Sequence, residues 1–194
     1  MNRSFIQIVR LSAILIFAAG TYTQANDNEF EDTQSRPQSI PYSQKPAEFI
    51  DTPYADEQNV LFEFFLDDPN KIHSALFWLR SYMNTLMAEP YGLAPEFMNI
   101  IVLIHGTEIV TLAKKNYPQY QSAVKRMIYY EQLGVEFRVC GDAANDFGYK
   151  PEDFYSFVKI IPNAMAEIAH WQHQGYALIR PLVFEKKFSV EDIR

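Results

Sequence analysis

The chain is poor in cysteine and glycine, and both shortages narrow its chemistry. Cys140 is the only cysteine among 194 residues, so the chain cannot form an internal disulfide. The seven glycines include no phosphate-cradling, glycine-rich signature. We therefore expect no bound nucleotide and no other cofactor. What remains to explain is the purpose of a single thiol.

Positive charge is also scarce. The formal net charge is −7 at pH 7, and no cluster of lysine and arginine offsets it locally. The first 25 residues contain only two charged side chains, Arg3 and Arg10, so without them 15 basic residues face 24 acidic ones, a balance of −9. Such a surface repels phosphate backbones, and we expect no nucleic-acid partner.

The N-terminus has no hydrophobic run long enough to span a bilayer. The apolar run at residues 11–20 is well below the roughly 20 residues that a spanning helix needs. It follows two arginines and precedes a small-x-small site that ends at Ala25, which predicts a cleaved signal peptide over residues 1–25. We expect export to the periplasm, with no membrane association after cleavage. The alternative is an uncleaved amphipathic anchor; a lipoprotein anchor is excluded, because no cysteine ends the run.

The remaining chain divides into three parts by composition. Residues 26–56 are acidic and polar with repeated prolines and no apolar period, which predicts a linker or extended arm that is solvated or packs along a partner subunit. Residues 57–185 form the expected domain, and residues 186–194 a C-terminal tail. At 48% hydrophobic and 15% aromatic content, the chain can build one sizeable core.

Strand-type and helix-type segments alternate within the domain. Strands are expected at residues 60–66, 98–104, 135–139, 157–161 and 176–179. Helices are expected at residues 71–87, 118–132, 143–147 and 162–174, with a further helical stretch between His105-Gly106 and Lys115. The continuous apolar run 98–104 indicates a central strand covered on both faces. The alternation predicts an α/β fold, a mostly parallel five-stranded sheet flanked by helices.

The candidate site lies where the predicted strands end. Loops after parallel strands meet at one sheet edge, which would bring Asp67, His105, Cys140 and Asn163 toward a common crevice. Backbone N–H groups of a helical turn after Cys140 could stabilise its thiolate, and His105 could act as a base or a stabilising cation. The alternatives are that Cys140 is inert core, that His105 caps a helix or satisfies a loop carbonyl, and that Asp67 caps the first helix together with Asp68.

One helix carries a histidine pair, His170 and His173, at a spacing that could hold a metal ion. No third ligand of matching spacing accompanies them, so a solvated helix face is the preferred interpretation. We expect no metal site.

Several segments together resemble the DsrE/DsrF-like family in order and spacing. They are residues 101–106, 134–141, 148–153, 158–164 and 174–179. The resemblance covers roughly residues 57–181 and implies a YchN-like parallel α/β sandwich, assembled as a trimer or hexamer. In sulfur-relay members, the cysteine that corresponds to Cys140 carries a persulfide and passes sulfur between proteins. Many exported members have no defined activity.

The family pattern departs from this chain in one loop. Relatives often have a second glycine and a proline after the His-Gly pair, whereas this chain continues with Thr107 and Glu108. We therefore do not expect this loop to bind the same ligand as the corresponding loop of its relatives. The crevice candidates remain Gly106, Gly141, Asn163 and Asp67.

Three functions are consistent with these observations. The first is an exported sulfur-relay protein in which Cys140 accepts a sulfane sulfur and His105 tunes the thiolate, with a sulfur donor or acceptor protein as partner. The second is a non-catalytic oligomeric binding module with a structural cysteine. The third is a thiol redox sensor.

Overall fold

The computed structural model describes residues 47–194. The expected signal peptide, residues 1–25, and most of the 26–56 linker lie outside the described residues. Residues from Ile50 onward form one compact unit, and the account below concerns that unit. Among the described residues, no helix combines the length and the apolar character that crossing a bilayer requires.

The sheet has five strands, and all of its pairings are parallel. The strands are β1 (Gln58–Phe64), β2 (Met98–Ile104), β3 (Glu136–Cys140), β4 (Val158–Ile161) and β5 (Ala177–Ile179). Their order is β4-β3-β2-β1-β5, so the continuous apolar strand β2 is central, as its sequence predicted. The expected α/β class is confirmed, with a sheet that is wholly rather than mostly parallel.

Helices connect successive strands. They are α1 (Ile72–Met87), α2 (Tyr117–Gln132), α3 (Gly141–Asp146), α4 (Ala164–His173) and a short α5 (Val190–Ile193) in the C-terminal segment. The helix expected before Lys115 is instead two 3₁₀ turns, Thr107–Leu112 and Lys114–Asn116. Ala113 separates them because it is extended and forms a β-bridge with Phe154, which prevents a continuous α-helix.

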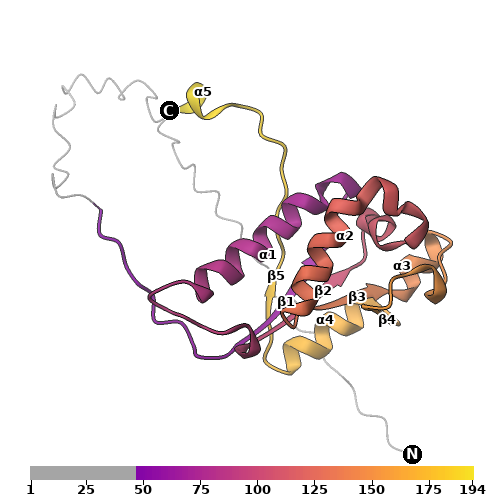
Figure 1. The fold of residues 1–194 in the computed structure, drawn as a ribbon, viewed down its shortest axis with the longest axis horizontal. Helices are drawn as coiled ribbons and strands as arrows, with labels where there is room; N and C mark the ends of the chain where they lie inside the picture. The colour runs from indigo at the N-terminus through magenta and orange to yellow at the C-terminus, as the bar shows by residue number, and fades with distance from the viewer. Residues whose placement is uncertain (1–46) are drawn as a thin grey trace, which may run out of the picture. The chain divides into compact units, whose positions relative to one another are not determined.

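The two faces of the sheet are covered unequally (Figure 1). Helices α1 and α2 lie against one face, where the main core contains alternate strand residues such as Phe62, Val102 and Phe137. Helix α4 lies on the opposite face over a much smaller cluster, and its buried residues are Ala164 and Ile168. The second face therefore has room for polar side chains among its apolar ones.

A charged network occupies part of this thinly covered face. Arg138 on β3 forms ion pairs with Glu136 on its own strand and with Glu167 on α4. Its guanidinium also lies 4.8 Å from the ring centroid of Trp171, a cation–π contact. Arg138 thus holds α4 on the sheet by charge as well as by packing.

Candidate functional site

Cys140 and His105 end neighbouring strands at the carboxyl edge of the sheet. Cys140 is the last residue of β3, and Ile104 at the end of β2 pairs with Val139. His105 continues the β2 ladder, because its backbone N–H donates to the Phe64 carbonyl at 3.2 Å. Adjacent strands lie roughly 4.8 Å apart, so the two residues are neighbours on the α4 face. This is the juxtaposition that the strand ends predicted.

The thiol of Cys140 is buried beneath the start of α4. Cys140 is 4% exposed and packs among apolar residues that include Ile161 and Ala164. The backbone N–H of Ala164, the first residue of α4, donates to its Sγ at 3.3 Å. A donor at the positive end of a helix suits a sulfur that carries negative charge. The donor therefore comes from α4 and not from the turn after Cys140, where the sequence placed it.

His105 belongs to a second cluster that the sequence analysis missed. Its Nε2 lies 3.0 Å from Oε1 of Glu63, a carboxylate on β1 that is only 6% exposed. Arg180, which follows β5, donates from Nε to the other oxygen of the same carboxylate. The ring of Phe65 stacks on His105 at a centroid distance of 4.6 Å. A signal was present, since Glu63 is the one charged residue in the otherwise apolar run from Val60 to Leu66.

This cluster opens onto a hollow in the surface. The hollow has a volume of about 500 Å³ and is lined by Glu63, Phe65, His105, Met165, Arg180, Pro181 and Leu182. Cys140 is not among these residues, although Met165 directly follows the residue that donates to its thiol. The first turn of α4 thus borders the hollow through Met165 and the thiol through Ala164.

Gly106 and Glu108 build the loop after β2. A side chain at position 106 would place its Cβ 2.5 Å from both Oε2 of Glu108 and the backbone N of Leu66, so only glycine fits there. The fully buried Glu108 carboxylate accepts N–H bonds from Leu66 at 2.9 Å and Gly106 at 3.0 Å. Burial raises the pKa of Glu108, and the backbone hydrogen bonds oppose that rise. Glu108 thus holds this loop together through its hydrogen bonds to the Leu66 and Gly106 backbone.

Gly141 and Asn163 bring the ends of β3 and β4 together. A Cβ at position 141 would lie 3.0 Å from the Ile161 carbonyl oxygen, and the Asp142 N–H donates to Pro162 at 3.3 Å. Asn163 caps α4 by accepting N–H bonds from Met165 at 2.9 Å and Ala166 at 3.1 Å. Its amide also donates to the Asp142 carboxylate at 2.8 Å. These residues position the start of α4 over the thiol.

Asp67 lies away from this arrangement. Its exposed carboxylate pairs with Lys71 at 2.7 Å, and that hydrogen bond is the main reason why its pKa is lowered. Asp68, not Asp67, caps the following turn by accepting the Asn70 N–H at 2.8 Å. The capping interpretation therefore holds for one of the two aspartates.

The histidine pair on α4 has no further ligand beside it. His170 and His173 are exposed, and the His170 ring lies edge-on to Trp171 at a centroid distance of 5.0 Å. Within residues 47–194, no group of three or more His, Cys, Asp or Glu side chains is arranged to hold a metal ion.

The fold and site define a class: a wholly parallel α/β domain with one cysteine at the carboxyl end of an inner strand. The family model of the DsrE/DsrF-like family matches residues 70–181, more than half of the chain. The chain belongs to the DsrE/DsrF-like family. No curated protein matches it.

Two solved structures resemble this chain, and one of them shares its fold. A protein of unknown function from Methanobacterium thermoautotrophicum superposes with a TM-score of 0.50 at 21% identity, over 64% of this chain and 100% of that one. A conserved protein of unknown function from Bacteroides thetaiotaomicron has a TM-score of 0.41 at 13% identity, over 63% of this chain and 93% of that one. The first of these supports the fold.

Proposed function

We propose that this protein is a sulfur carrier in which Cys140 holds a persulfide. The observation that carries the proposal is the Ala164 N–H, which donates to Sγ at the positive end of α4. A backbone donor of this kind favours an anionic sulfur, whereas the apolar packing around Cys140 opposes it. Membership of the DsrE/DsrF-like family, which is often implicated in sulfur relay, supports the same chemistry.

The loading step is a thiolate exchange. The Cys140 thiolate attacks the outer sulfur of a donor persulfide, a new S–S bond forms on Cys140, and the S–S bond of the donor breaks. The donor leaves as a thiolate, so no oxidant or reductant is consumed. His105 sits on the adjacent strand and can accept the proton of the Cys140 thiol before attack, with Glu63 holding its ring.

Burial sets a condition on this step. A thiol that is 4% exposed cannot meet a donor until its cover moves. That cover is the first turn of α4, which separates Cys140 from the hollow beside His105. The donor or acceptor, a protein or a small thiol, would enter through that hollow.

Export and assembly complete the proposal. The signal-peptide pattern of residues 1–25 supports secretion across the inner membrane into the periplasm. The family resemblance supports a homo-oligomer, a trimer or hexamer. The thinly covered sheet face and several exposed aromatic side chains, among them Phe65, Phe77 and Trp78, are consistent with contacts between copies.

Intact-mass and peptide mass spectrometry after exposure to an organic persulfide tests the carrier directly. We expect the folded protein to gain the mass of one sulfur atom on the peptide that contains Cys140, and to lose it to a reducing thiol. A Cys140→Ser variant is the matched control and gains none. If the folded protein gains nothing while the unfolded chain does, Cys140 is not a carrier.

The burial of Cys140 favours one other candidate, a non-catalytic binding module with a structural cysteine. In that case a Cys140→Ser variant keeps both its fold and its cellular phenotype. Loss of the phenotype with a retained fold would instead favour the carrier.

A further inference from the structure

The C-terminal segment, residues 180–194, has many apolar side chains and little beneath them. We call this segment the arm. After β5 it runs out from the sheet and ends in α5 (Figure 1). Its exposed large apolar residues are Leu182 at 68%, Phe184 at 78%, Phe188 at 65%, Val190 at 52% and Ile193 at 71%. Burying apolar side chains of this size is favourable, so the arm has a tendency to bind a surface.

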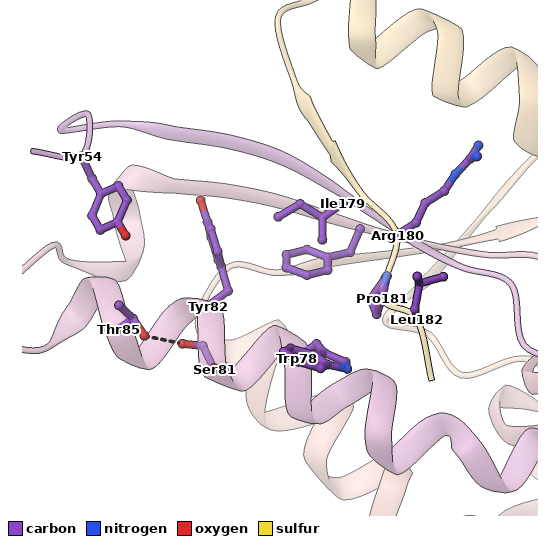
Figure 2. A pocket seen from close by; sticks show the side chains of 10 residues that line it. Tyr54, Trp78, Ser81, Tyr82, Thr85, Ile179, Arg180, Pro181 and Leu182 are labelled. Atoms are coloured by element: carbon purple, nitrogen blue, oxygen red, sulfur yellow. Dashed lines mark hydrogen bonds between the residues drawn. The ribbon is translucent and has the colours of Figure 1, made fainter. Parts of the chain in front are cut away.

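The outer side of α1 offers a surface of matching character. Phe77 and Trp78 on α1 are 45% and 48% exposed. Trp78 lines two neighbouring hollows, of about 530 Å³ and 550 Å³. Figure 2 shows the first, where Trp78 and Tyr82 of α1 face the chain that leaves β5 at Ile179. The second hollow combines aromatic and aliphatic side chains with the basic groups of Arg80, Arg126 and Lys186, which suits a segment that is both apolar and acidic.

Charge is complementary between α5 and the second hollow, although the arm as a whole carries four basic and three acidic side chains. The second hollow is lined by Arg80 and Arg126 next to Phe77, and the Arg80 guanidinium lies 5.2 Å from the Phe77 ring centroid. Helix α5 presents Glu191 and Asp192 between the apolar residues Val190 and Ile193. An acidic and apolar turn therefore fits a basic and aromatic hollow.

From these observations we infer that the arm of one copy docks on the α1 surface of a second copy of this chain. The inference rests on the proposed homo-oligomer and names the segment that joins its copies. Each copy carries one arm and one receiving surface, so an exchange of arms between copies covers the apolar side chains of both. The two patches differ, which permits either a reciprocal dimer or a closed ring.

The course of the arm favours a second copy over the arm's own domain. Its first residues, Leu182 to Phe184, already form one wall of the second hollow in their own chain. Lys186 still lines that hollow, and beyond it the chain runs on to α5 (Figure 1), with Phe188 and Ile193 exposed. Docking on the same α1 would require the arm to reverse direction within a few residues, whereas an arm from another copy can arrive extended.

Disulfide trapping between two differently tagged full-length chains tests the contact. One chain carries Phe77→Cys and the other Ile193→Cys, both in a Cys140→Ala background whose fold is checked by circular dichroism. Mixing and mild oxidation should give a covalent dimer that contains both tags. Phe147→Cys, at a similarly exposed position after α3 that lines neither hollow, replaces Phe77→Cys in the control and should give none. A third chain carries both Phe77→Cys and Ile193→Cys. If this chain cross-links internally and the mixed chains give no dimer with both tags, the inference is overturned.

Light scattering with the native thiol in place provides the second measurement. We expect the double variant Phe188→Glu and Ile193→Glu to weaken self-association at least tenfold, whereas Phe97→Glu, an exposed aromatic outside these hollows, leaves it unchanged. An oligomer that persists in the arm variant contradicts the arm's role but leaves the proposed assembly standing. A wild-type chain that is monomeric at all concentrations contradicts both. Neither result bears on sulfur loading, which is measured separately.

Discussion

At Glu108, burial and backbone hydrogen bonds have opposite effects on the charge of one carboxylate. Its carboxylate accepts two backbone N–H bonds while completely buried, and burial is the larger effect on its pKa. A glutamine can accept with only one oxygen, so its amide nitrogen would face a backbone N–H. We expect Glu108→Gln to lower the free energy of unfolding by about 1–3 kcal/mol, measured by urea denaturation.

The same residue predicts a pH dependence. Because the pKa of Glu108 is raised above its ordinary 4.5, the folded state binds this proton more readily than the unfolded chain does. Its contribution to stability is complete below pH 4.5 and is lost as the pH rises through the folded-state pKa. The gap in unfolding free energy between wild type and Glu108→Gln should therefore narrow as the pH rises from 4. A widening gap would show that the hydrogen bonds outweigh burial.

Residue positions were predictable from the sequence where strand ends determine them, and not where tertiary contacts do. The position of Cys140 beside His105 follows from the ends of two neighbouring strands. The partner of His105 does not, because Glu63 and Arg180 are 117 residues apart in sequence and meet only through the pairing of β5 with β1. Gly106 was predicted as a crevice candidate; its close packing against Leu66, which also requires glycine, depends on tertiary structure and had no local signal.

At the scale of elements, the first turn of α4 controls access to the thiol. Asn163 caps this turn through its side-chain oxygen. Asn163→Ala should destabilise the turn by about 1 kcal/mol and speed the alkylation of Cys140 in the folded protein about fivefold. Asn163→Ser is the matched control, because it keeps a capping oxygen and should change the rate little. An unchanged rate in Asn163→Ala would mean that the thiol is reached by another route.

Element types followed from the sequence more reliably than their boundaries. The strand 98–104 matches β2 residue for residue, because its apolar run is bounded at both ends. The first strand begins and ends two residues earlier than the predicted 60–66, since Leu66 and Phe65 are apolar but serve the loop beside His105. The 3₁₀ turns before Lys115 were predicted only as helical, because the bridge from Ala113 to Phe154 is a tertiary contact with no local signal.

At the scale of the whole molecule, the parallel sheet separates two cores of unequal size. Alternation of strands and helices is enough to predict a parallel sheet, but it does not determine the strand order or which face each helix covers. Those depend on side chains that come together only in the folded chain, such as Arg138 with Glu167 and Trp171. The result is one face under α1 and α2 and another under α4 alone.

This inequality predicts two levels of stability in one domain. Local opening costs the least free energy where few apolar side chains are buried. Helix α4 has two buried side chains, and the edge strand β5 has none. In native-state hydrogen exchange, we expect amides of α4 and β5 to exchange at least about tenfold faster than those of β2. Exchange in α4 as slow as in β2 would mean that the domain opens only as a whole. Since α4 covers Cys140, that outcome would require global unfolding for a donor to reach the thiol, and the carrier proposal would lose its route of entry.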